Sequence, residues 1–297
     1  MANSSESEML VEPKSHQPLL REGDAYVGPT GERYEIEGRI IRVLRNVDPA
    51  LARELESQAK AIDDYSDPRF LMPRYELDMA RLALVQLFAG RPPSGDILDA
   101  GCGIGILGRL FPDLGLVGLD ASVDLLRKAD TGYRLLVEAS AEALPFADKS
   151  FDVIVALNML HHVIDPEQAV REFARVLRPG GTLVCVDPRK VLPVEIAKQA
   201  LRGKDEAFAP THKAFSVPEY AAIVTQGGLF QIEESRRVGL LTLLAMGGLD
   251  ATKWSFKIRD RDRVVSLLRG ADAALFKLPG VWRLGLNLAL RAVRAPS

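Results

Sequence analysis

The sequence predicts an α/β protein with a mostly parallel sheet that is covered by helices on both of its faces. Between residues 96 and 187, short apolar runs alternate with segments of helical patterning. Apolar runs in this alternation are typical of strands buried in a doubly wound sheet. A glycine-rich turn follows the first run, and ligands of doubly wound sheets bind at the carboxyl ends of the strands.

The central elements are predicted one by one from this alternation. Strands are expected at 96–99, 115–119, 134–138, 151–156 and 181–187, with helices between them at 105–111, 122–130, 141–144 and 166–177. Two later strands are expected at 230–238 and 286–293, the second of them antiparallel. The segment 240–280 between these strands is longer than a hairpin needs, and such insertions commonly wall a substrate pocket.

Three segments precede this domain, which we place at 93–297. Residues 1–9 are small, polar and acidic, so disorder is expected there. Residues 10–45 contain short β-type runs separated by turn residues, which indicates a small β module. Residues 46–92 are expected to form a helical linker, whose first helix begins after Asp48 and runs to about Ile62.

Composition limits the classes of partner. The chain has 297 residues and a net charge of −2, which provides no general attraction for nucleic acid. Its longest uncharged apolar stretch, 238–249, has 12 residues, whereas a membrane-spanning helix needs about 20. The two cysteines, Cys102 and Cys185, are too few for a disulfide framework, and the polar start excludes a secretory signal. We therefore expect a cytoplasmic protein.

The segment from Ile97 to Gly105 reads ILDAGCGIG and predicts a nucleotide-type ligand site. Glycines at alternate positions let the backbone approach a ligand where any Cβ atom would collide with it. Asp120 follows the next apolar run and is expected to accept hydrogen bonds from ribose hydroxyls. A dinucleotide site would need a third glycine at position 106, where the chain has isoleucine.

This motif resembles that of class I S-adenosylmethionine-dependent methyltransferases of the small-molecule type. The resemblance implies S-adenosylmethionine as cofactor and a Rossmann-like, seven-stranded, mostly parallel doubly wound sheet. It also implies that the helical linker covers the cofactor pocket. In this family the motif acid supports the methionyl amine, the glycines approach the cofactor, and the second acid binds ribose. The corresponding residues are Asp99, Gly101, Gly103, Gly105 and Asp120.

Two further segments resemble cofactor contacts of the family. Residues 139–146 match a segment in which an aspartate usually accepts the adenine amino group, and Ser140 stands in its place. The Ser140 hydroxyl or the backbone around Ala141 is expected to bond adenine, more weakly than a carboxylate would. Asn158 is expected at the carboxyl end of the strand at 151–156, beside the cofactor's methyl group.

Candidate acid–base residues come next. His161 and His162 resemble the Leu-His-His stretch of sugar and natural-product O-methyltransferases, which implies a histidine base near a substrate hydroxyl. A histidine pKa near 6.5 suits proton removal from an alcohol. Alternatively, one histidine packs beneath the loop; of the two, we favour His161 as the base. Asp187 ends the strand at 181–187 and either orients a base, binds a substrate hydroxyl or caps a turn.

Residues 10–45 resemble the small zinc-binding domain that opens bacterial large-subunit rRNA guanine-N1 methyltransferases. The shared residues are Pro13, the run His16–Leu19, Tyr26 and Pro29. The positions that would hold the metal are occupied by Glu12, Ser15, Gly28 and Glu32. A structural zinc site needs thiolate or imidazole ligands, so we expect a module that binds no metal.

These observations predict methyl transfer to a small, hydrophobic metabolite, at oxygen, with no nucleic-acid partner. One alternative is an rRNA guanine-N methyltransferase, which the N-terminal resemblance favours. Residues 1–60, however, carry eight Lys/Arg against eleven Asp/Glu, the wrong sign for attracting RNA. The other alternative is a non-catalytic scaffold that binds the cofactor, which Ser140 and the altered metal-ligand positions favour.

Overall fold

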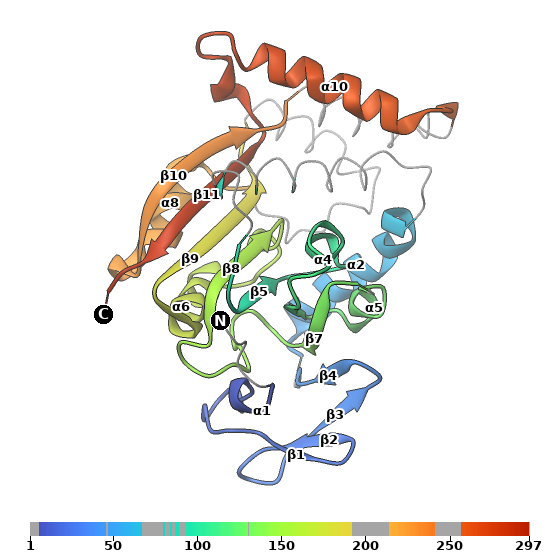
Figure 1. Cartoon of the computed structure of the whole chain (residues 1–297), viewed down its shortest axis with the longest axis vertical. Coiled ribbons are helices and arrows are strands. Elements are labelled where there is room, and N and C mark those ends of the chain that lie inside the picture. The colour runs from blue at the N-terminus through green and yellow to red at the C-terminus, as the bar shows by residue number, and fades with distance from the viewer. Residues whose placement is uncertain are drawn as a thin grey trace.

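The computed structural model describes residues 6–45, 47–66, 93–129, 131–191, 214–240 and 257–296, together with residues 80, 84, 87 and 88. One sheet of eleven strands organises this described part of the chain (Figure 1). Seven of the strands come from the domain expected at 93–297, and four N-terminal strands continue the sheet at one edge. The sheet is therefore longer than the seven-stranded sheet that the sequence predicts.

The order of the seven central strands reverses at one place in the sheet, its topological switch point. They are β5 (Ile97–Ala100), β6 (Leu116–Asp120), β7 (Tyr133–Glu138), β8 (Phe151–Leu157), β9 (Leu177–Pro188), β10 (Phe230–Val238) and β11 (Asn287–Arg294). Their order is β7-β6-β5-β8-β9-β11-β10. Strand β11 runs antiparallel to both of its neighbours, β9 and β10, and the other pairs among the seven are parallel. The chain leaves β5 toward β6 on one side and later resumes at β8 on the other. Ligands of such sheets bind at this point, outside the carboxyl ends.

Helices cover both faces of the central sheet. They are α4 (Ile106–Leu110), α5 (Val123–Leu126), α6 (Pro166–Val176) and α8 (Val217–Thr225). The buried side chains form two clusters: Leu107 of α4 belongs to one, and Phe173 of α6 belongs to the other. Successive residues of β6 alternate between the clusters, since Leu116 packs in the first and Val117 in the second. This alternation is the expected property of a strand buried on both faces.

The helix predicted at 141–144 is wrong, because these residues form a turn. The amide of Glu142 donates to the Ser140 hydroxyl oxygen at 3.2 Å. The amide of Leu144 donates to a carboxylate oxygen of Glu172 on α6 at 2.8 Å. Side chains that capture backbone amides in this way compete with helix formation. Helix α5 is also shorter than predicted and ends at Leu126 instead of residue 130.

The N-terminal strands extend the sheet beyond β7 instead of forming a separate unit. They are β1 (Leu20–Glu22), β2 (Ala25–Val27), β3 (Arg33–Glu37) and β4 (Ile40–Arg42). Strand β4 pairs in parallel with β7, with Ile41 opposite Val137. This pairing satisfies backbone groups that would otherwise be exposed along β7. The predicted disorder over residues 1–9 is wrong for residues 6–9, which form helix α1 (Glu6–Met9), because Met9 is buried in the same cluster as the strands.

Helix α2 (Pro49–Ser66) is the described part of the linker expected at 46–92. The Asp48 carboxylate accepts hydrogen bonds from the amides of Ala50 and Leu51, at 2.8 and 3.0 Å, as an N-cap does. Most of the linker after residue 66 lies outside the described residues, as does segment 241–256 of the insertion. The rest of the insertion contains α10 (Arg261–Leu275). Within the described ranges, no helix has the length and apolarity to cross a bilayer.

Candidate cofactor site and histidine pair

The glycine turn after β5 is fastened to the end of β6. The amides of Gly101 and Cys102 donate to the carbonyl of Leu119, at 2.7 and 2.9 Å. The Asp120 carboxylate accepts from the amide of Gly103 at 2.9 Å and from that of Ser122 at 2.9 Å. The structure therefore brings the turn and the predicted ribose-binding acid together at the carboxyl ends of β5 and β6.

The three glycines of the turn differ in what a side chain at each position would meet. Gly101 has φ +70°, and a Cβ atom there would lie 2.5 Å from the Cβ of Met159, which leaves no room for a side chain. Gly103 has φ +52°, but a Cβ there would meet no atom within 4 Å. The turn thus leaves open space in the direction that a Cβ of Gly103 would take. Gly105 packs against Ala129, so its small size serves the packing of the turn.

Asp99 is a buried acid at the centre of this arrangement, with an exposed fraction of 2%. The hydroxyl of Tyr133 on β7 donates to its carboxylate at 2.6 Å. Burial raises the pKa of Asp99 to about 7; the Tyr133 hydrogen bond opposes this rise, and the nearby charge of Asp120 adds to it. Burial also raises the pKa of Asp120. Two acidic groups therefore lie buried close to each other, which is costly unless a cation joins them.

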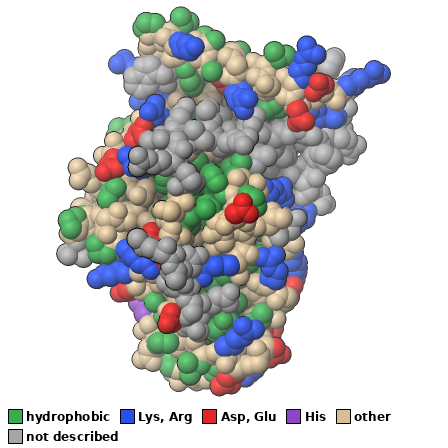
Figure 2. Space-filling view, in the orientation of Figure 1, with side chains coloured by type: hydrophobic (Ala, Val, Ile, Leu, Met, Phe, Trp, Pro, Cys, Tyr) green, Lys and Arg blue, Asp and Glu red, His purple; other side chains and the backbone are tan. Residues whose placement is uncertain are grey.

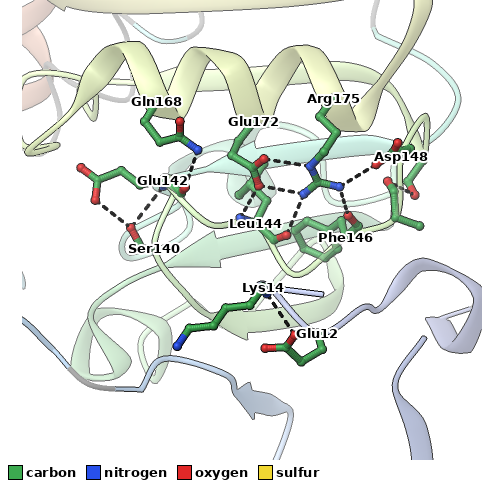
Figure 3. Close-up of polar contacts among 12 residues, drawn as sticks. Glu12, Lys14, Ser140, Glu142, Leu144, Phe146, Asp148, Gln168, Glu172 and Arg175 are labelled. Carbon is green, nitrogen blue, oxygen red and sulfur yellow. Dashed lines mark hydrogen bonds and ion pairs between the residues drawn. The ribbon is translucent and has the colours of Figure 1, made fainter. Parts of the chain in front are cut away.

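The segment expected to contact adenine is held from the side of α6. Figure 3 shows three side chains of α6 that reach it: Gln168, Glu172 and Arg175. The Arg175 guanidinium donates to the carbonyls of Leu144 and Phe146, at 2.9 and 2.6 Å, and pairs with Glu172 at 2.7 Å. Within the segment, Ser140 is half-buried and Ala141 is buried. Ser140 already accepts the Glu142 amide, so its hydroxyl is oriented by the turn.

The N-terminal strands hold the same segment from the other side. The amide of Val11 donates to the carbonyl of Pro145 at 3.0 Å, and the amide of Ala147 donates to the carbonyl of Met9 at 2.8 Å. The guanidinium of Arg42 on β4 pairs with the Glu138 carboxylate, with one contact at 3.1 Å. Residues 138–147 are therefore fixed between α6 and the N-terminal strands.

The four positions that resemble zinc ligands lie together. The Glu12 carboxylate accepts from the amide of Ser15 at 2.5 Å. A Cβ atom on Gly28 would lie 3.5 Å from the Glu32 carboxylate and 3.6 Å from the Glu12 side chain. Among the described residues, no three or more His, Cys, Asp or Glu side chains are grouped so that they could hold a metal.

The remaining predicted residues lie in the loop after β8 and at the end of β9. Asn158 has φ +52°, and its amide donates to the carbonyl of Val186 at 2.6 Å, so it turns the chain at the strand end. Asp187 is fully buried at the end of β9 and accepts from the His161 amide at 3.1 Å and from its Nδ1 at 2.8 Å. The hydroxyl of Tyr220 on α8 donates to the other Asp187 oxygen at 2.5 Å. Of the roles considered for Asp187, this geometry favours orientation of a histidine.

The two histidines differ in exposure and in the carboxylate that each ring contacts. The side chain of His161 is 10% exposed and that of His162 is 25% exposed. Their rings lie 3.9 Å apart between centroids. The Nδ1 atom of His162 lies 2.7 Å from a carboxylate oxygen of Glu54 on α2. His161 thus packs beneath the loop, and His162 is the more exposed ring.

Three side chains that complete these contacts were missed by the sequence analysis: Glu54, Tyr133 and Tyr220. Glu54 sits in a helix whose other acids resemble a solvated face, and its partner is 108 residues away. Tyr133 reads as an ordinary strand residue, although its ring fills space that Cβ atoms at Gly105, Gly108 and Gly118 would invade. The fit of the Tyr133 ring against these glycines is the signal in the sequence that could have indicated its role. It can be recognised only once β6 is known to pair with β7.

Comparisons with known proteins agree with this geometry. Residues 98–185 match a family model described as a methyltransferase domain. The chain is 36% identical to 27-O-demethylrifamycin SV methyltransferase of Amycolatopsis mediterranei, over 52% of this chain and 61% of that protein. It is 34% identical to a ubiquinone biosynthesis O-methyltransferase of Cupriavidus pinatubonensis, over 46% of this chain and 57% of that protein. The chain thus spans about three fifths of these curated relatives.

Solved structures share the fold at low identity. A SAM-dependent methyltransferase of Thermotoga maritima superposes with a TM-score of 0.55 at 18% identity, over 80% of this chain and 99% of that one. The [4+2]-cyclase SpnF superposes with a TM-score of 0.50 at 19% identity, over 73% of this chain and 81% of that one. These likenesses support a Rossmann-like α/β fold. They assign no activity, because one fold carries different chemistries.

Proposed function

We propose that this chain, whose residues 98–185 form a methyltransferase domain of the S-adenosylmethionine-dependent type, transfers a methyl group to an oxygen of a small hydrophobic metabolite. The observation that carries the proposal is the joining of Asp99, the glycine turn and Asp120 at the switch point of the sheet. Ligands of doubly wound sheets bind at this place.

The residues present fit the cofactor. S-adenosylmethionine supplies an electrophilic methyl group on a positively charged sulfur. Asp99 is the group proposed to hold the cofactor's ammonium, which would stabilise a carboxylate that burial disfavours. Asp120 is proposed to accept from the ribose hydroxyls, and the open space above Gly103 admits the ligand. The turn at Ser140 and Ala141 is proposed to receive adenine.

The choice of acceptor rests on the curated relatives and the histidine pair. The relatives named above are methyltransferases of rifamycin and of ubiquinone biosynthesis, and the latter is named as an O-methyltransferase. A third relative, from Pseudescherichia vulneris, is a malonyl-[acyl-carrier protein] O-methyltransferase. A hydroxyl acceptor carries a proton that must leave, and a histidine in the neighbouring loop is suited to take it. Alignment of acceptor and methyl group is the other contribution of the enzyme.

Calorimetry with S-adenosylhomocysteine, the demethylated product, tests the proposal first. We expect the wild-type protein to bind it. We expect Asp120→Asn to weaken binding by about 10–100-fold, because the substitution removes the charge of the group that accepts hydrogen bonds from the ribose hydroxyls. Asp113→Asn, which alters an exposed acid in the loop after α4, serves as control. Mass spectrometry then follows methyl gain on hydroxylated quinones and catechols with S-adenosylmethionine. Absence of any binding by folded protein would overturn the proposal.

One structural observation favours a second candidate, an rRNA guanine-N methyltransferase. The four positions at Glu12, Ser15, Gly28 and Glu32 converge as ligands of a zinc-binding domain would. On the face shown in Figure 2, however, acidic and basic side chains are interspersed around the N-terminal strands, without a continuous basic surface. RNA binding depends strongly on such a surface. Primer extension on rRNA from a deletion strain separates the candidates, since only this one predicts a lost modification.

A further inference from the structure

Helix α2 carries a buried carboxylate that contacts the histidine pair. Glu54 is 2% exposed, and its Oε1 lies 2.7 Å from Nδ1 of His162, although the two residues are 108 positions apart. The Gln58 side-chain amide donates to the same oxygen at 3.3 Å. A carboxylate rarely becomes buried without partners, because its desolvation is costly. The placement of Glu54 therefore depends on the ring that it contacts.

This contact determines which nitrogen of His162 carries the proton. We assign the proton to Nδ1 of His162, because an ionised Glu54 carboxylate can only accept a hydrogen bond. In a neutral imidazole the other nitrogen, Nε2, then holds a lone pair and can accept a proton. A carboxylate behind a histidine also stabilises the imidazolium that forms when the ring takes that proton.

The neighbouring ring is arranged so that it stays neutral. Burial lowers the pKa of His161, and its hydrogen bond to Asp187 only partly opposes this. The two rings are 3.9 Å apart, so a charge on both would be repulsive. A neutral His161 places no positive charge beside His162, so it does not repel a proton that this ring takes up.

His162 belongs to the loop that borders the proposed cofactor site. Met159 of the same loop touches the glycine turn at Gly101. Burial raises the pKa of Asp120, and the charge of His162 is among the influences that oppose this rise. With 25% of its side chain exposed, His162 is accessible from solvent in this loop.

We propose that Glu54 is a positioning residue that presents Nε2 of His162 to the acceptor hydroxyl, an inference that rests on the function proposed above. The hydroxyl proton passes to Nε2 while the acceptor oxygen bonds to the methyl carbon. The bond from that carbon to sulfur breaks, and its electron pair stays on sulfur. The products are a methyl ether, a neutral thioether and a protonated His162, which afterwards releases its proton to water.

The first test is the tautomer of His162, measured by ¹⁵N–¹H correlation NMR on the full chain, with His162→Gln to assign its signals. We expect the Nδ1–H tautomer in the wild type and in Glu56→Leu, a matched change at an exposed position of the same helix. Glu54→Leu leaves no side-chain acceptor at position 54 for Nδ1–H, so we expect the Nε2–H tautomer to become dominant. An unchanged tautomer in folded Glu54→Leu overturns the inference, whatever the acceptor.

The second test separates positioning from fold stability by kinetics, with 3,4-dihydroxybenzoate as acceptor and S-adenosylmethionine as donor. Removal of a general base costs about 10²–10⁴-fold in rate, which we expect for kcat of His162→Gln. Glu54→Gln is expected to lower kcat at least about tenfold, with KM for the donor and the Kd of S-adenosylhomocysteine unchanged. Normal kcat in Glu54→Gln would count against the inference alone, whereas lost product binding by the wild type would count against the proposed function.

Discussion

Cofactor binding is expected to depend on pH through Asp99. Burial raises the pKa of this carboxyl to about 7, the Tyr133 hydrogen bond opposes the rise, and the charge of Asp120 adds to it. An ammonium group bound beside Asp99 requires the ionised carboxylate, so binding removes the proton from molecules that carry one. The affinity should therefore fall as the pH drops below 7, and it should level off above 7.

The size of the effect follows from the pKa. With a pKa of about 7, roughly one molecule in eleven has Asp99 ionised at pH 6, against about ten in eleven at pH 8. The apparent Kd at pH 6 should thus be about tenfold higher, a difference of about 1.4 kcal/mol. About 0.9 proton should leave the protein for each ligand bound at pH 6, and about 0.1 at pH 8.

Isothermal titration calorimetry with S-adenosylhomocysteine measures both quantities. At each pH, two buffers of different ionisation enthalpy report the number of protons released. Asp99→Asn should bind weakly at every pH with no such release, and the exposed control Asp113→Asn should behave as the wild type. Equal affinity at pH 6 and pH 8 in the wild type, or undiminished proton release from Asp99→Asn, would refute the reasoning.

Three further outcomes follow from the same site. Asp99→Asn should stabilise the ligand-free protein at pH 8 and not below pH 4, because a pKa that is raised in the folded state makes ionisation of Asp99 destabilising. Urea denaturation should show a gain in the free energy of unfolding of at most about 4 kcal/mol, which corresponds to the difference between a pKa of 3.8 and one of about 7. Tyr133→Phe removes a donor to that carboxylate, so the midpoint of the calorimetric affinity–pH profile should move above 7; an unmoved midpoint would show that the hydrogen bond has no influence. Gly101→Ala should lower the denaturation midpoint and the free energy of unfolding by about 1–3 kcal/mol, because the added Cβ would collide with Met159. Gly103→Ala should lower the free energy of unfolding less, because a Cβ there meets open space. Equal losses in the two variants would exclude the collision as the cause.

Patterns within short stretches of sequence predicted those elements that depend only on residues close by in the chain. The central strands lie close to their expected positions, since the apolar runs that form them are buried on both faces. The helix expected at 141–144 failed because Glu172, 28 residues later in the chain, binds the amide of Leu144. Disorder failed at residues 6–9 because Met9 is buried against the sheet. Neither partner can be identified from the local sequence.

The residues of the candidate site also differ in whether they could be predicted from short stretches of sequence. The glycine turn and its two acids were predictable, because strand, turn and acid follow each other at short spacing and meet at one edge of a parallel sheet. The roles assigned to these residues stay predictions. The choice of base stays a prediction as well: burial and Asp187 enclose the ring of His161, and His162 is the more exposed ring.

The sequence by itself determined the fold class and the location of the ligand turn, because these depend on periodicity and short spacing. The kind of cofactor was implied by the resemblance of that turn to a methyltransferase motif. Only the tertiary structure decided that β4 extends the sheet at β7, that Tyr133 holds Asp99 and that Glu54 meets His162. Each of these is a contact between segments distant in the chain. Such contacts are selected by how whole elements pack, and a carboxylate in a helix gives no sign of its partner until that packing is known.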